Sequence, residues 1–252
     1  MANDTKFPTE IVELPSKGYF YPKDSPLASG KVEMKYMTAR EEDILTSPNL
    51  MQQGTMINVF LKALIIDKSI DVDEFLIGDK NGLIVASRIL GYGKDYDFEY
   101  TTESGDLFTS IVDLTTLQEK QIDLSKFEKG QTEFPYTLPA SKRILTFQLM
   151  TQKAEFKVER EIIALEKISD GISYEITTRL KHFILSVDGK TEKEYINHFV
   201  DNEFLSRDAL DFRRYISSIT PDVDMTTTVT GKDGIEREVA VPITAQFFWP
   251  KA

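Results

Sequence analysis

Hydrophobic positions in the first part of the chain recur with the spacing of α-helices. Between residues 55 and 66 the apolar side chains surround the helix axis, which is typical of a buried helix. A further helix is expected to begin at Asp79, which can cap it, and to end at Gly91. These patterns predict a mainly helical N-terminal unit over residues 1–95.

A capping box predicts one more helix in this unit. Thr38 follows the strand-like stretch 31–37, and Glu41 stands three residues later, where its carboxylate can accept the backbone N–H of Thr38. Pro48 is expected to end this helix early.

A segment rich in Pro, Gly and Ser precedes these helices. Residues 14–30 read LPSKGYFYPKDSPLASG, which predicts a series of turns and an extended arm. Its aromatic residues Tyr19, Phe20 and Tyr21 either pack on the protein's own body or anchor a partner, and we favour packing on the body.

From Tyr96 onward, apolar residues recur at every second position instead of at the spacing of a helix. Tyr96, Phe98 and Tyr100 alternate with acidic residues, as expected for a half-buried strand. Similar alternation marks residues 108–114, 134–138 and 145–149. Pro135 favours an edge position for the middle one of these three. Residues 96–151 therefore predict a small antiparallel β section.

Helical spacing returns after this section and predicts a bundle. The first helix starts near Lys153, the second ends with Val187 before Gly189, a capping box of Thr191 and Glu194 opens the third, and the last ends before Pro221. Helices of this length joined by short turns can pack against one another as a bundle.

A hairpin is predicted after the bundle. Residues 225–239 alternate on either side of a turn at residues 231–234, and the aromatic cluster of Phe247, Phe248 and Trp249 follows. The bundle and the hairpin form a C-terminal unit over residues 152–252. The predicted fold class is α+β, with a helical N-terminal unit, a small antiparallel β section, and a C-terminal helical bundle with a terminal β-hairpin.

Composition narrows the classes of function. The chain has 252 residues, no cysteine and a net charge of −11. The lack of cysteine excludes disulfides and thiolate sites, and the negative charge argues against nucleic-acid binding. With no long apolar run and no leader pattern in the sequence, we expect a protein that remains in the cytoplasm and binds neither nucleic acid nor membrane.

Residues of catalytic type form no recognisable motif. His182 and His198 lie on separate predicted helices, with no acidic residue at the spacing of a metal ligand. The acidic stretch from Asp71 has Phe75 where a calcium loop needs a ligand. The sequence thus predicts no catalytic residue, no cofactor and no metal site. A hydrolase is the weakest hypothesis, and we expect a protein that is not an enzyme.

Several long strings of the sequence resemble a known family. They are LPSKGYFYP, SPLASGKVEMKYMTAREEDILTS and LIGDKNGLIVASRILGYGKDY, and further along TTRLKHFILSVDG, FVDNEFLSRDALDFRRYI and PITAQFFWP. On these strings the chain resembles the baseplate hub assembly proteins of T4-like bacteriophages over nearly its whole length.

The resemblance implies a function and partners. It implies a non-enzymatic, chaperone-like factor that acts on baseplate hub or tape measure proteins while a contractile tail is assembled in the host cell cytoplasm. The alternative is a permanent structural subunit of the hub, which would be found in the virion tail. Sequence does not separate the two, and it leaves a homo-oligomer open.

The matching strings also suggest residues for partner binding. These are Lys17, Tyr19, Tyr21, Lys35, Tyr36, Arg40, Glu41, Phe248 and Trp249. Aromatic residues in such strings are equally suited to a core, and Arg40 can pair with a nearby carboxylate. Some family members carry paired cysteines near the C-terminal strands, which suggests a zinc ribbon. Because this chain has no cysteine, its hairpin depends on side-chain packing alone.

Overall fold

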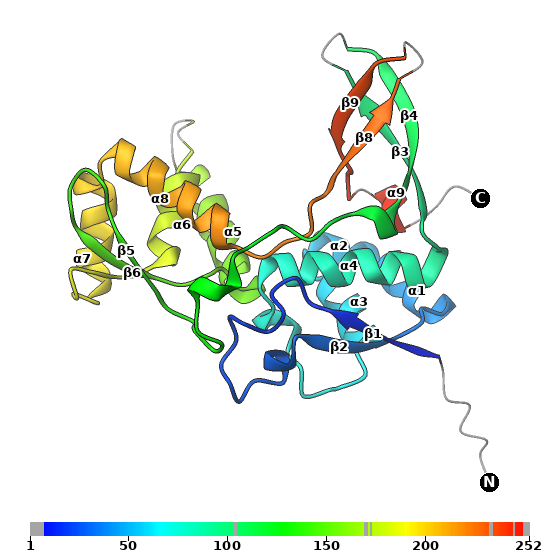
Figure 1. The fold of residues 1–252 in the computed structure, drawn as a ribbon, viewed down its shortest axis with the longest axis horizontal. Helices are drawn as coiled ribbons and strands as arrows, with labels where there is room; N and C mark the ends of the chain where they lie inside the picture. Colours follow the sequence, from blue (N-terminus) through cyan, green and yellow to red (C-terminus); the bar gives the residue numbers. More distant parts are fainter. Residues whose placement is uncertain are drawn as a thin grey trace.

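Helices and short antiparallel strand pairs make up the computed structural model of the protein. The structure describes residues 8–102, 105–168, 171, 173–231, 234–243 and 245–248. Figure 1 shows three parts: a central helical part at the lower right, a pair of hairpins at the upper right, and a helical bundle at the left. The predicted α+β class is confirmed.

The central part combines one strand pair with four helices. Its strands are β1 (Thr9–Glu13) and β2 (Lys31–Lys35), and its helices are α1 (Ala39–Leu45), α2 (Pro48–Gln52), α3 (Met56–Leu64) and α4 (Ile77–Tyr92). The capping box at the start of α1 is confirmed, because Glu41 Oε2 accepts the Thr38 backbone N–H at 3.0 Å. Pro48, as the first residue of α2, separates that helix from α1.

Both predicted ends of α4 are wrong. The N-cap residue is Leu76, and Asp79 lies inside the first turn, where its carboxylate accepts hydrogen bonds from the arm rather than from its own helix. The helix continues through Gly91 to Gly93, which has a φ of 83°. Gly91 is instead a close contact, since a Cβ there would lie 2.5 Å from Met37 Cε.

Two hairpins stand beyond the end of α4, and the first of them follows α4 directly in the sequence. Strands β3 (Asp95–Thr101) and β4 (Leu107–Asp113) form one hairpin, and β8 (Thr226–Thr230) and β9 (Glu236–Ala240) form the other. The two stand together in Figure 1. Tyr96 joins them at the base, because its hydroxyl donates to the Pro242 carbonyl at 2.9 Å and its ring packs on Phe247 of α9 (Ala245–Phe248).

Arg88 fixes the junction between α4 and β3. This residue is buried, and its guanidinium donates to the carbonyls of Gly93 at 2.8 Å and Asp95 at 3.1 Å. A cation at a helix C-terminus also interacts favourably with the helix dipole. Arg88 therefore orients the hairpin relative to the helix.

The remaining strands belong to the bundle. Strands β5 (Phe134–Thr137), β6 (Ile144–Phe147) and β7 (Ile184–Val187) form one sheet in that order. The edge position predicted for the strand with Pro135 is confirmed. The single sheet expected over residues 96–151 is wrong, because β3 and β4 pair apart from β5 and β6.

Helices α5 to α8 complete the bundle beside this sheet. They are α5 (Gln152–Glu166), α6 (Glu175–Phe183), α7 (Lys193–His198), continued by a π-helical turn at Phe199–Glu203, and α8 (Ser206–Ile219). The helix expected to reach Val187 ends at Phe183, since the next four residues pair with β6 as β7. Thr191 does not cap α7, which begins after Glu192, because a turn between Val187 and Lys190 holds the chain outside the helix.

Two connecting segments join the bundle to the hairpins. Residues 118–120 and 222–224 run antiparallel and are hydrogen-bonded, with Asp224 N to Gln118 O at 2.7 Å and Lys120 N to Asp222 O at 2.9 Å. The residue just before the second segment, Pro221, lies against α4 at Gly78, where an added Cβ would lie 1.8 Å from Pro221 O. Only glycine fits at that point.

Candidate binding groove

Asp79 ties the N-terminal arm to helix α4. Its carboxylate is fully buried and accepts three hydrogen bonds from the arm: Ser16 N at 2.8 Å, Ser16 Oγ at 2.6 Å and the Tyr21 hydroxyl at 2.6 Å. The Tyr21 hydroxyl in turn accepts the Leu76 backbone N–H at 2.9 Å, which satisfies a donor at the helix start. The arm is thereby fixed to the body by polar contacts that span more than fifty residues of sequence.

Burial shifts the pKa values of both Asp79 and Tyr21 in this network. Burial raises the pKa of Asp79 above its usual value, and the hydrogen bonds from Ser16 and Tyr21 offset part of that rise. Burial beside Asp79 also raises the pKa of Tyr21, so its hydroxyl stays protonated and remains a donor. The network therefore serves to hold the arm in place.

Two glycines let the arm fold back on itself. Gly18 has a φ of 74°, and a Cβ there would lie 2.5 Å from Ala28 O. Gly30 has a φ of 71° and approaches the Lys17 backbone equally closely. This turn presents Phe20 and Tyr21 to the body and leaves the following residues, 22–29, beside an open groove.

An aromatic chain connects the arm to the far side of the bundle. The Phe20 ring contacts Phe134 of β5 with ring centroids 5.4 Å apart, Phe134 contacts Phe147 of β6 at 5.5 Å, and Phe147 contacts Phe212 of α8 at 5.1 Å. Packing of the arm on the protein's own body is confirmed, with Phe20 and Tyr21 each 4% exposed.

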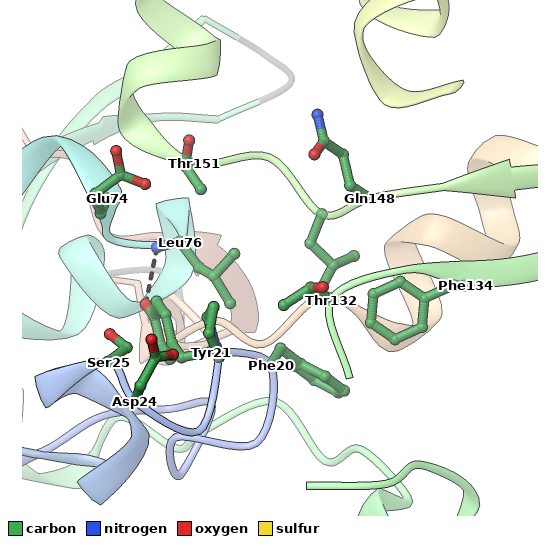
Figure 2. Close-up of a pocket in the computed structure, with 12 residues that line it drawn as sticks. Phe20, Tyr21, Asp24, Ser25, Glu74, Leu76, Thr132, Phe134, Gln148 and Thr151 are labelled. Carbon is green, nitrogen blue, oxygen red and sulfur yellow. Dashed lines mark hydrogen bonds between the residues drawn. The ribbon is translucent and has the colours of Figure 1, made fainter. Parts of the chain in front are cut away.

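The groove consists of two adjoining cavities along the arm. The first has a volume of about 430 Å³ and the second of about 750 Å³, and Tyr21 and Ser25 line both. The other residues lining the first are Phe20, Pro22, Asp24, Glu74, Leu76, Thr132, Phe134, Gln148, Leu149 and Thr151, while Lys23, Glu128 and Lys129 are among those lining the second. Figure 2 shows Asp24, Ser25 and Glu74 across the first cavity from Thr132 and Phe134.

The charge of the groove changes along its length. Asp24 and Glu74 lie at the rim of the first cavity, over an apolar floor that includes Leu76, and Glu74 already pairs with Lys153 at 3.2 Å, so among the described residues Asp24 supplies the unpaired acidic charge of the rim. Lys23 and Lys129 lie at the second cavity, together with one carboxylate, Glu128. An extended chain segment fits such a groove if it places a basic side chain at the first cavity and an acidic one at the second.

The residues suggested by sequence fall in three places. Lys17, Tyr19 and Tyr21 lie in the arm; Tyr21 lines the groove but is buried, and Lys17 Nζ pairs with Glu119 at 2.7 Å. Tyr19 is half-buried, and its carbonyl accepts the Gly130 N–H at 2.7 Å, which positions the second cavity.

The second and third places lie away from the groove's lining. Lys35 Nζ pairs with the buried Glu41 at 2.7 Å, Tyr36 is half-buried and Arg40 is exposed. The structure places Phe248 in the core, with its ring 5.9 Å from that of Phe60. Trp249 lies outside the described residues.

Sequence reasoning missed most residues that shape the groove. Glu74, Thr132, Gln148 and Thr151 come from separate elements and carry no common motif. Asp79 was expected only as a helix cap. Asp79 belongs to the string LIGDKNG, and the arm belongs to the string LPSKGYFYP, which resembles the same family. That shared resemblance was the one sequence signal that could have linked Asp79 to the arm.

The two histidines each contact a carboxylate. His182 Nε2 lies 2.9 Å from Glu161 and His198 Nδ1 lies 3.2 Å from Glu203. Among the described residues, no group of three or more His, Cys, Asp or Glu could hold a metal ion. None of the helices in the described part of the chain is long and apolar enough to cross a membrane.

Comparison of the chain with protein-family models, with curated proteins and with solved structures finds no match in any of the three. The resemblance to baseplate hub assembly proteins therefore stays a prediction from the sequence strings.

Proposed function

We propose that the chain is a non-enzymatic assembly factor for the contractile tail of a bacteriophage, and that it acts on baseplate hub or tape measure proteins in the host cell cytoplasm. The observation that carries the proposal is the set of long sequence strings that resemble the hub assembly family. Several of these strings come from different parts of the chain, so a chance likeness in one of them does not account for the rest.

The groove is the part of the molecule best suited to this role. The first of the strings supplies Phe20, Tyr21 and Pro22 to its lining, and Asp79, from another string, holds that lining in place. A fixed groove binds a flexible segment without first having to order its own walls, which reduces the entropic cost of binding.

The proposed occupant is an extended segment of a tail protein. A basic side chain would lie beside Asp24, apolar side chains would enter the first cavity beside Leu76, and an acidic side chain would approach Lys129. Alternating charge of this kind fixes the direction in which the segment binds.

Photo-crosslinking during infection tests the proposal. A photoreactive phenylalanine analogue replaces Thr132, which is exposed on the groove, and in a matched control it replaces Lys193, which is exposed at the start of α7. Mass spectrometry of the crosslinked products is expected to identify hub or tape measure proteins with the analogue at Thr132 and none with the analogue at Lys193.

The outcomes separate the function from the site. Tail proteins captured only at Lys193 would contradict the groove as the site while supporting the partner class. Proteins unrelated to tails at Thr132 would contradict the assembly function. Mass spectrometry of finished particles then distinguishes a transient factor, which is absent from them, from the alternative of a permanent hub subunit, which is present in fixed copy number.

A further inference from the structure

The outer face of the β3–β4 hairpin carries apolar residues that the fold does not use. Leu107 and Ile111 of β4 are each 66% exposed. They lie four residues apart, so they point to the same face and stand about 13 Å from one another. A strand at the surface of an antiparallel pair ordinarily has polar side chains on its outer face.

The side chains that pack this hairpin against the rest of the protein lie on its inner face. Tyr96 and Phe98 of β3 and Val112 of β4 are buried there, and Tyr96 packs on Phe247. Leu107 and Ile111 therefore contribute no core contact. Their exposure lowers the solubility of the protein and adds nothing to the stability of the fold.

Carboxylates line the other strand of this outer face. The register pairs Asp97 with Ile111 and Thr101 with Leu107, so these four side chains share one surface. Asp95 and Glu99 lie on the same face of β3, on either side of Asp97. On β4 this face carries Leu107, Thr109, Ile111 and Asp113, so the two apolar side chains flank Thr109, and Asp113 pairs with Lys94 at 2.6 Å. The acidic row of β3 lies beside them.

This charge pattern disfavours a second copy of the chain as the natural occupant. Two such faces in contact would place Asp97 of one copy near the carboxylates of the other, within a chain whose net charge is −11. Like charges brought together at an interface oppose association. The complementary surface is apolar along one line and basic beside it.

We propose that the outer face of the β3–β4 hairpin docks an amphipathic helix of a partner protein that carries Lys or Arg along one edge of its apolar stripe. The helix lies along β4, with its apolar side chains on Leu107 and Ile111 and its basic edge over Asp97. A helix is about 10 Å across, which matches a two-stranded surface whose strands are about 4.8 Å apart. The proposal rests on this surface alone and does not require the assembly function proposed above.

Binding of designed peptides to the full chain tests the proposal. Two labelled helical peptides share one Leu and Ile stripe, and one has Lys along its edge while the other has Glu. Fluorescence polarisation is expected to show binding of the Lys peptide with a Kd about tenfold or more below that of the Glu peptide. The Leu107→Ser/Ile111→Ser variant is expected to weaken the Lys peptide about tenfold, with an unchanged circular dichroism spectrum.

Two further variants keep the test specific. Ile163→Ser/Ile176→Ser removes two other exposed apolar side chains, 52% and 51% exposed, from α5 and α6, and it is expected to leave the Kd of the Lys peptide unchanged. Asp97→Lys is expected to reverse the preference toward the Glu peptide. Equal binding of the Lys peptide to wild type and Leu107→Ser/Ile111→Ser would overturn the proposal, as would a dimer in sedimentation that this variant dissociates.

Discussion

Replacing Tyr21 by Phe removes a single hydroxyl group that joins the N-terminal arm to helix α4. That hydroxyl donates to Asp79 Oδ2 at 2.6 Å and accepts the Leu76 backbone N–H at 2.9 Å. The ring itself stays the same size, so the substitution leaves packing in place and removes the two hydrogen bonds. Both partners of the lost hydroxyl are buried, so the substitution leaves a buried acceptor and a buried donor without this partner.

The magnitude follows from these two bonds. Loss of one of the three hydrogen-bond donors to the buried Asp79 carboxyl group lowers the free energy of unfolding by about 1–2 kcal/mol. Loss of the acceptor of the Leu76 backbone N–H lowers it by about 1–3 kcal/mol. We therefore expect Tyr21→Phe to lower the free energy of unfolding by about 2–5 kcal/mol. Tyr19→Phe is the matched control, because Tyr19 is half-buried and no hydrogen bond of its hydroxyl is found among the described residues. Its expected cost is below about 0.5 kcal/mol.

Equilibrium unfolding in urea measures both variants. With a slope of about 3 kcal/mol per molar urea, the midpoint for Tyr21→Phe is expected to fall by about 0.7–1.7 M, and that for Tyr19→Phe to stay near the wild type. Equal midpoints for the two variants would refute the account of the arm, since they would mean that the bonds to Asp79 and Leu76 do not hold it.

Three other changes test the packing and the charges. Gly78→Ala is expected to cost about 2–4 kcal/mol in thermal unfolding, because its Cβ would lie 1.8 Å from a rigid carbonyl oxygen of Pro221, whereas Gly91→Ala meets only the flexible end of a methionine and is expected to cost less than half as much. Burial lowers the pKa of Lys80 to about 8, so the unfolded chain binds more protons than the folded one between pH 8 and its ordinary pKa of 10.5. The stability of the wild type relative to Lys80→Met should therefore rise as the pH increases across that window, and a flat difference would contradict it. Asp208→Ala removes the acceptor of two backbone N–H groups in the β5–β6 turn, at 2.7 and 2.9 Å, and is expected to cost about 1–3 kcal/mol in urea unfolding. Burial opposes ionisation of Asp208, but the hydrogen bonds from the turn prevail and lower its pKa, so this contribution is present above the ordinary carboxyl pKa and is lost as the pH falls below it.

Local patterns predicted most elements of the fold because they depend on neighbours in sequence. The alternation of Tyr96, Phe98 and Tyr100 predicted β3, and the residue types of Thr38 and Glu41 predicted the start of α1. The pattern could not show that β3 and β6 belong to different sheets, because strand pairing depends on contacts between residues far apart in sequence.

Two errors have specific physical causes. Residues 184–187 follow α6 without a break in the apolar pattern, and a short apolar run suits a helix and a strand equally, so only pairing with β6 decided its form. Asp79 has the residue type of a helix cap, but its carboxylate accepts three hydrogen bonds from the arm, outside its own helix.

The candidate groove was only partly accessible from sequence. The resemblance drew attention to Tyr21, which lines the groove, but not to Glu74 or Thr132, which the fold brings opposite one another. The exposed Leu107 and Ile111 were expected simply as strand residues, since only the three-dimensional structure shows which face of the hairpin is buried.

Electron microscopy of cells infected by a phage in which the gene for this chain is interrupted tests the assembly function most directly. We expect filled or empty heads without complete tails, and restoration of tails when the intact chain is supplied from a plasmid. Normal numbers of contractile tails in the absence of the chain would contradict it.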